Sequence, residues 1–259
     1  MLLDLQQPAQ EYKPALTVIE ELRESAIETW KARMVNEHGS AQVFEGLAQQ
    51  LAAVGLTERD IQRVRSFADE ERNHGVLCGA VVEALGGKAI AKALPVVPFP
   101  QHDDVSPLEA ALRNLLSISC LSETVAVALI GAEREDMPEG ELRQLLTKIW
   151  AEECGHANFG WRLLPTLLNK GDDQMRERLG EYLVVAFAHL EQHELAHLPI
   201  AADPPPEGAT LGLCSGKSAR LLFYTTVEKI IVPGLESHGL PAKRSWDRRH
   251  EAYEAQTAL

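Results

Sequence analysis

Hydrophobic residues recur every three to four positions along most of this chain, which is the spacing typical of amphipathic helices. No stretch alternates strictly between apolar and polar residues, so strands are not predicted. The fold class is therefore all-α. The predicted helices cover about residues 16–54, 57–85, 107–135, 141–169, 174–198 and 217–238. We also expect the first of these helices to be interrupted near residues 36–40 and the fourth to be kinked at Pro165.

A proline-rich stretch, residues 88–106, separates the second and third predicted helices. Its prolines exclude a regular helix, and it is long enough to cross from one end of a helical bundle to the other. The other connections are short, so we expect two antiparallel hairpins joined by a crossover and followed by a fifth helix. Residues 1–200 would form this bundle. Residues 201–259 would be a helical extension packed on it, with a loosely held tail after Pro241.

One short motif, Glu-Glu-x-x-His, occurs in the second helix of each hairpin. The first copy is Glu70-Glu71-Arg72-Asn73-His74, and the second is Glu152-Glu153-Cys154-Gly155-His156. A glutamate and a histidine three residues apart project from the same face of a helix. Each copy can therefore present a carboxylate and an imidazole to one metal ion.

Each motif also has a glutamate opposite it on the first helix of its hairpin. Residues equidistant from the turn of an antiparallel hairpin lie side by side. About the first turn, near Gly55, the first motif mirrors onto about residues 37–40, where Glu37 lies. About the second turn, near Met137, the second motif mirrors onto about residues 119–122, one position short of Glu123. Four helices would thus each contribute a carboxylate at one level.

A set of glutamates and histidines without thiolates is typical of an iron or manganese site. Four inward-facing glutamates without a cation would repel one another and cost several kcal/mol, about the penalty of an uncompensated buried charge. The alternative is that these residues are ordinary charges on the surfaces of helices.

With these residues the chain resembles the ferritin-like di-iron carboxylate proteins over about residues 24–170, and its first hairpin is similar to bacterial ferritin-like domain proteins. That family places one Glu on each of two helices and Glu-x-x-His on the other two. The spacing in that family favours the second glutamate of each Glu-Glu pair as the metal ligand, although the first glutamates, Glu70 and Glu152, stay alternatives. The resemblance implies a ferritin-like four-helix bundle with a crossover and added C-terminal helices. It also implies a common set of metal ligands and catalytic residues: Glu37, Glu71, His74, Glu123, Glu153 and His156.

The activity implied by the resemblance is that of a non-haem di-iron oxidase or oxygenase, which uses two Fe ions and O₂ to oxidise a small organic substrate with electrons from an external donor. A mixed Mn/Fe site uses the same ligands and stays an alternative. A ferroxidase that handles iron and a metal-stabilised interaction module are the other functions considered.

Three further side chains are candidates for positions around the metal ligands. His193 and His197 share one face of the fifth helix and could supply an extra ligand or a proton donor. The alternative is a helix end that turns polar towards solvent. Trp30 lies two turns before Glu37 and could line a substrate pocket, with a core aromatic as the alternative.

Composition narrows the partners of the chain. A net charge of −13 argues against nucleic acid as the main partner. No run of about eighteen apolar residues is present and the N-terminus lacks the basic and apolar regions of a secretory signal, so neither a membrane span nor secretion is expected. The four cysteines form no CxxC pair, which favours reduced thiols and a cytoplasmic location. The oligomeric state stays open, with a homodimer as one option.

Overall fold

The computed structural model describes residues 1–95 and 97–252, which are predominantly helical, and so confirms the all-α prediction. The chain forms two compact units. Unit 1 comprises Met1–Pro100, Ile130–Glu152 and Pro204–Cys214, and unit 2 comprises Gln101–Leu129, Glu153–Asp203 and the residues from Ser215 on. Helices α5 (Glu123–Asp136) and α6 (Glu141–Leu168) each begin in one unit and continue into the other. The predicted boundary near residue 200 stays a prediction.

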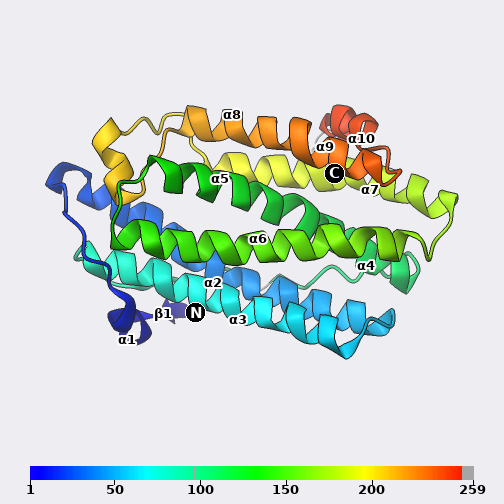
Figure 1. Ribbon diagram of the computed structural model, residues 1–259, viewed down its shortest axis with the longest axis horizontal. Helices are drawn as coiled ribbons and strands as arrows, with labels where there is room; N and C mark the ends of the chain where they lie inside the picture. The colour runs from blue at the N-terminus through cyan, green and yellow to red at the C-terminus, as the bar shows by residue number, and fades with distance from the viewer. Residues whose placement is uncertain (96, 253–259) are drawn as a thin grey trace. The chain divides into compact units, whose positions relative to one another are not determined.

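The main element of unit 1 is an antiparallel hairpin of α2 (Arg23–Ala53) and α3 (Glu58–Ala84), which lie side by side in Figure 1. Helix α2 begins later than predicted, after the 3₁₀ turn η2 (Glu20–Leu22), and continues without a break through residues 36–40, so both expectations were wrong. Gly55, at a φ of 78°, provides the left-handed residue that ends this helix. The Thr57 hydroxyl accepts a hydrogen bond from the Asp60 N–H and caps α3.

Glycine allows α2 and α3 to approach closely beside the first motif. A Cβ atom added at Gly75 would lie 2.7 Å from the His38 Cβ, 3.1 Å from the His38 nitrogen and 3.1 Å from the Met34 carbonyl oxygen. Two of these three neighbours are backbone atoms of α2, which cannot rotate away. The two helices can therefore lie this close together because residue 75 is glycine and has no side chain.

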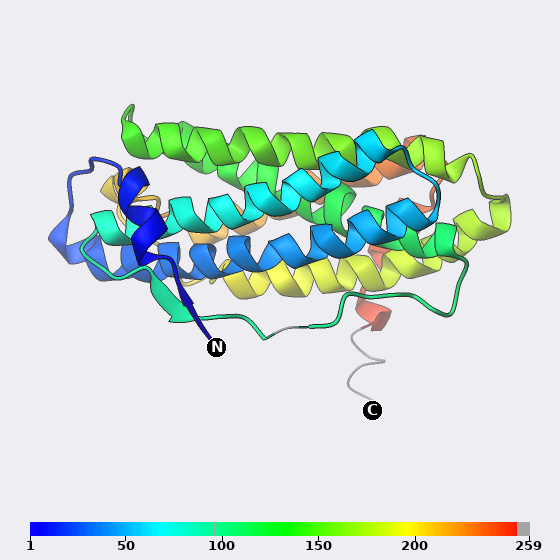
Figure 2. The same ribbon diagram turned by 90° about the horizontal axis from the view of Figure 1, so that it is seen from below.

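The N-terminal segment of unit 1 forms structure that the hydrophobic pattern did not predict. Strand β1 (Leu2–Asp4) pairs antiparallel with β2 (Ile90–Lys92), as Figure 2 shows, and strands of three residues are too short to display an alternating pattern. The short helices α1 (Gln6–Ala9) and η1 (Gln10–Tyr12) follow β1 and pack against α3. The η4 turn (Pro206–Leu211) also belongs to unit 1, where the Trp30 indole N–H donates to the Leu211 carbonyl at 2.8 Å.

Unit 2 begins with a helix whose turns change in width. Helix α4 (Pro107–Leu115), capped by Ser106, runs into the π-helical segment η3 (Leu116–Ser122) and then into α5. The fifth predicted helix is α7 (Asp173–His197), with Asp172 as its N-cap. The predicted helix over 217–238 is α8 (Gly216–Thr226), the π segment η5 (Val227–Ile231) and α9 (Val232–Ser237) in succession. Pro165 lies within α6, which continues to Leu168.

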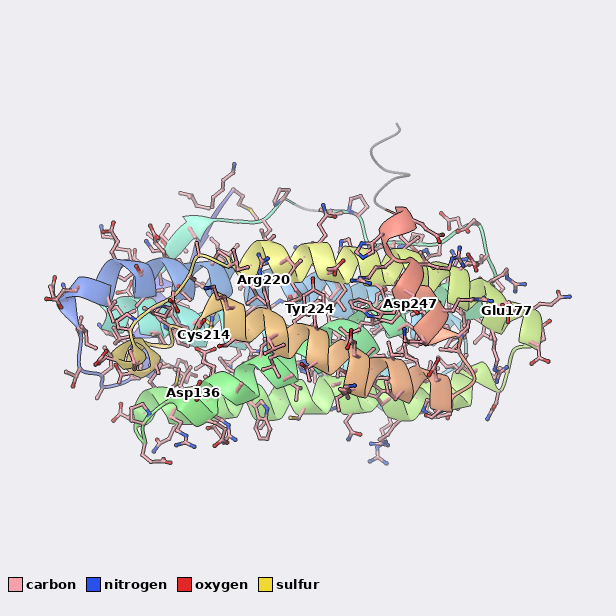
Figure 3. The ribbon with its side chains drawn as sticks, turned by 90° about the horizontal axis from the view of Figure 1, so that it is seen from above. Asp136, Glu177, Cys214, Arg220, Tyr224 and Asp247 are labelled. Atoms are coloured by element: carbon pink, nitrogen blue, oxygen red, sulfur yellow. The ribbon has the colours of Figure 1, made fainter. Side chains whose placement is uncertain are left out.

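The tail after Pro241 is held in place as far as it is described, which corrects the expectation of a loose end. It forms α10 (Ala242–Arg248), which packs on α7 with Trp246 buried. The Ser245 hydroxyl donates to the Gly180 carbonyl at 2.8 Å. Figure 3 shows Asp247 on this helix, with Tyr224 on α8 and Glu177 on α7. Residues 253–259, also part of the predicted tail, lie outside the described residues.

Among the described residues, one helical stretch, Pro107–Asp136, is long and apolar enough to cross a membrane by length and composition alone. Core helices of water-soluble proteins pass the same test. This stretch carries two buried glutamates with cationic partners: Glu109 lies 3.0 Å from Arg113, and Glu133 lies 2.7 Å from Arg33. Such pairs are typical of a helix packed inside a protein.

Replacing Gly75 by Ala tests the close approach of α2 and α3. Added bulk against backbone atoms should lower the free energy of unfolding by about 1–3 kcal/mol, measured by urea denaturation. Gly39→Ala, on the facing helix α2, is the matched control because its Cβ would meet only the flexible end of the Leu94 side chain, at 3.0 Å. The control substitution should leave the free energy of unfolding unchanged or raise it by up to about 1 kcal/mol, because Ala has a higher helix propensity than Gly. Equal effects of the two substitutions would contradict the packing argument.

Candidate metal centre

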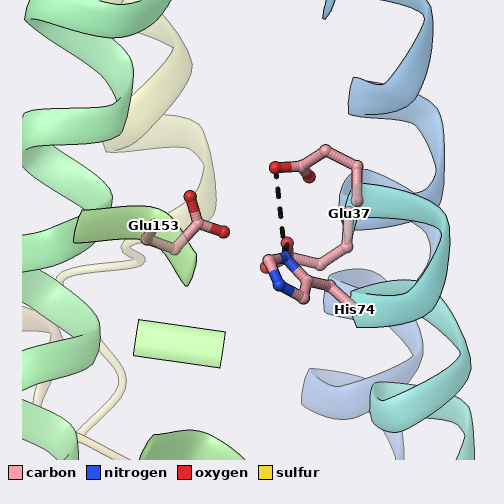
Figure 4. A group of neighbouring side chains, drawn as sticks. Glu37, His74 and Glu153 are labelled. Atoms are coloured by element: carbon pink, nitrogen blue, oxygen red, sulfur yellow. Dashed lines mark ion pairs between the residues drawn. The ribbon is translucent and has the colours of Figure 1, made fainter. Parts of the chain in front are cut away.

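The first cluster, Glu37, Glu71 and His74, lies within unit 1. Helix α2 supplies Glu37, and α3 supplies the other two residues from one face. Each residue offers a ligand atom within 4.8 Å of the ligand atoms of the others. The His74 Nδ1 lies 3.4 Å from a Glu37 carboxylate oxygen, the ion pair drawn in Figure 4, and 3.9 Å from one of Glu71. His74 and Glu71 are buried, and Glu37 is partly exposed.

A third carboxylate orients the His74 ring. The other ring nitrogen, Nε2, lies 2.8 Å from a carboxylate oxygen of Glu152, which comes from the part of α6 in unit 1. Glu152 also accepts a hydrogen bond from Lys148 one turn earlier. Burial raises the pKa of Glu152, but the hydrogen bonds from His74 and Lys148 outweigh it and lower the pKa to about 2. An ionised Glu152 accepts the Nε2 proton and leaves the Nδ1 lone pair directed at the first cluster.

The second cluster, Glu123, Glu153 and His156, lies within unit 2 and repeats this arrangement. The His156 Nδ1 is 3.5 Å from a carboxylate oxygen of Glu123 on α5 and 3.2 Å from one of Glu153 on α6. The ligand atoms of these residues also lie within 4.8 Å of one another. All three side chains are buried. In both clusters, therefore, an imidazole Nδ1 faces two carboxylates from two helices.

The π-helical segment η3 ends where Glu123 begins α5. The Glu123 N–H donates to the Ile118 carbonyl five residues earlier, in place of the usual four. The wide turn brings Ser119 against α6, where a Cβ added at Gly160 would lie 2.3 Å from the Ser119 Cβ. The Ser119 hydroxyl is buried without a hydrogen-bond partner. Such π turns inside α-helices occur frequently at functional sites.

These distances and atom types suit metal ligation. Two atoms that each bind one ion at about 2.0–2.2 Å lie about 3–4 Å apart, the range found here between imidazole nitrogen and carboxylate oxygen. Carboxylate oxygens with imidazole suit iron or manganese. The buried clusters of Glu and His could therefore bind metal ions.

The structure gives different neighbours to the two glutamates of each doublet. Glu71 and Glu153 belong to the clusters, whereas Glu70 forms an ion pair with Arg63 at 2.9 Å and Glu152 lies against His74. The sequence suggested Glu152 as an alternative partner of the histidine in its own motif. Its contact with a histidine on another helix was missed, because the identity of a tertiary neighbour cannot be read from spacing along one helix.

The structure shows the surroundings of the three further candidate residues. Trp30 is fully buried, with its indole N–H bonded to Leu211 and the Arg33 guanidinium 4.8 Å from its ring centre. His193 and His197 are exposed on α7, opposite its buried face, rather than directed into the core of unit 2. Partial burial, followed by the charges of His197 and His189, lowers the pKa of His193 to about 4.

Cys78 is the buried thiol closest in sequence to the first cluster. Burial, together with the charge of Glu37, raises the pKa of Cys78 well above its usual value, and the thiol stays protonated at pH 7. Cys78 belongs to the hydrophobic core of unit 1.

The close helix contacts at Gly75 and Gly160 were not predicted from the sequence. A glycine inside a predicted helix was the signal that could have indicated them.

Searches against protein-family models, curated proteins and solved structures found no match to this chain.

Replacing Glu71 by Gln should have opposite effects with and without metal. Two charged carboxylates within 4.8 Å repel each other by at least about 3 kcal/mol at an effective dielectric constant of about 20, of which the variant should recover about 1–3 kcal/mol of stability in the metal-free protein. With Fe(II) under anaerobic conditions it should be the less stable protein. Urea denaturation after chelation and after metal addition measures both effects. Glu28→Gln, at an exposed position of α2, should change neither, and a Glu71→Gln protein that is less stable without metal would contradict the repulsion.

Proposed function

We propose that the two clusters are the halves of one dinuclear centre and that the protein is a non-haem di-iron oxidase or oxygenase with a ferritin-like bundle. The observation that carries the proposal is the pair of consecutive residues Glu152 and Glu153 on α6. Glu152 contacts His74 of the first cluster, and Glu153 belongs to the second. Consecutive Cα atoms are only about 3.8 Å apart, so one helix turn serves both clusters.

The distribution of ligands over the helices supports a ferritin-like bundle. Helices α2 and α5 contribute one glutamate each, and α3 and α6 contribute Glu-x-x-His each. This is the ligand pattern of di-iron carboxylate bundles. The long connection from the end of α3 to the start of α4 at Pro107 is consistent with the crossover of that fold.

The ligand set favours two iron ions. Four carboxylates and two neutral imidazoles would offset the charge of two divalent ions, and this mixture of oxygen and nitrogen ligands suits iron, with Mn/Fe as the variant that uses the same ligands. When bound, a pair of reduced iron ions supplies electrons to O₂ and thereby the oxidising power for an organic substrate.

The protein's own residues would orient the metal ligands, compensate the charge of the ions and exclude water. Glu152 fixes the ring of His74 through Nε2, so that Nδ1 faces the carboxylates. The glutamates compensate charge, and because they can ligate through one or both oxygens they can follow a change in that charge. Burial of His74 and His156 excludes water from the imidazoles. A small organic substrate and an external electron donor complete the reaction, with the C-terminal helices as candidate substrate-covering elements.

Anaerobic titration with Fe(II), followed by addition of O₂, tests the proposal. We expect two irons per chain and consumption of O₂ that stops without an external electron donor. Glu71→Gln and Glu153→Gln remove one carboxylate from each cluster, and each should weaken iron binding at least about tenfold. Glu28→Gln, on α2 outside the clusters, is the matched control and should bind iron as the unaltered protein does.

The same titration separates the alternatives. O₂ uptake that continues with each further addition of Fe(II) would assign the protein as a ferroxidase. Two bound irons without O₂ consumption would assign a metal-stabilised module. Failure to bind two ions, with no effect of Glu71→Gln or Glu153→Gln, would overturn the metal centre itself.

A further inference from the structure

Three histidines form a ladder along the exposed face of α7. His189, His193 and His197 are spaced four residues apart, so they lie one above another on the helix. The His193 and His197 rings are 4.5 Å apart between centres, and the His189 ring stacks on His193 at 6.3 Å with an angle of 13° between planes. All three residues are exposed.

The hydrogen bonding of His197 leaves one of its nitrogens ready for a ligand. Its Nδ1 lies 2.8 Å from the His193 carbonyl oxygen. A carbonyl can only accept, so Nδ1 carries the proton and Nε2 presents its lone pair to solvent. Metal-binding histidines commonly donate their second ring nitrogen to a carbonyl in this way, because the bond fixes both tautomer and ring orientation.

The residues also match a pattern with a known physical basis. His193-Glu194-Leu195-Ala196-His197 reads His-Glu-x-x-His, in which the two imidazoles at i and i+4 on one helix face chelate a single zinc ion. Imidazole nitrogens suit zinc, copper and nickel, whereas the carboxylate-rich clusters suit iron or manganese. The ladder therefore differs in chemistry from the centre described above.

We propose that His193 and His197, the two closest residues of the ladder, form a separate binding site for a borderline divalent cation of the Zn²⁺ class. The site is on the surface and requires no rearrangement of the core. It does not depend on the function proposed for the two clusters.

Zn²⁺ binding measured by competition with a chromogenic chelator tests this site on the full chain. Replacing both His193 and His197 by Ala should remove one equivalent of bound Zn²⁺ per chain. His197→Ala alone should lower the affinity for this Zn²⁺ at least about tenfold. His238→Ala, which removes a histidine outside the ladder, is the matched control and should leave it unchanged. Exposed alanines favour helix, so the variants should fold normally, as circular dichroism would verify.

A second measurement identifies the ligands directly. In NMR spectra of the imidazole ¹⁵N nuclei, Zn²⁺ should shift the signals that disappear in the His193→Ala and His197→Ala variants. Unchanged Zn²⁺ stoichiometry and affinity in the double variant, or ladder signals that do not respond to Zn²⁺, would overturn the proposal.

Discussion

Repulsion between buried carboxylates is the physical constraint on which the core of this protein depends. Each cluster holds two glutamates from different helices with ligand atoms within 4.8 Å, beside a fully buried histidine. Burial of a charge is costly unless a countercharge accompanies it. Elsewhere the chain supplies that countercharge itself, as at Glu133 with Arg33 and at Glu109 with Arg113 and Arg178. The clusters instead place histidines beside the carboxylates, and these groups could bind metal ions.

The surrounding structure fixes the direction of the ligands. Glycine at position 75 lets α2 and α3 approach beside His74, and glycine at position 160 lets the wide turn of η3 approach α6 next to the second cluster. Glu152 sets the orientation of the His74 ring. Small residues for close approach and a hydrogen-bond partner for the imidazole are the means by which helical scaffolds place ligands accurately.

The hydrophobic period was sufficient to predict the helices, because amphipathic helices bury one face and their turns are marked by Gly and Pro. Reflection about the two turns was sufficient to find a carboxylate opposite each motif, because that geometry is local to a hairpin. It could not reveal the partner of Glu152, which depends on a helix distant in sequence. The π segments were missed since a single wide turn hardly changes the hydrophobic pattern, and α10 was missed because its contacts with α7 are tertiary. The exposed position of His193 and His197 reflects the rotation of α7, which spacing alone does not determine.

Diffraction from crystals grown with Fe(II) under anaerobic conditions, measured at the iron absorption edge, tests the central claim most directly. The account predicts two anomalous peaks per chain, one at Glu37, Glu71 and His74 and the other at Glu123, Glu153 and His156. A single peak, or peaks confined to surface residues while both clusters bind no iron, would contradict it.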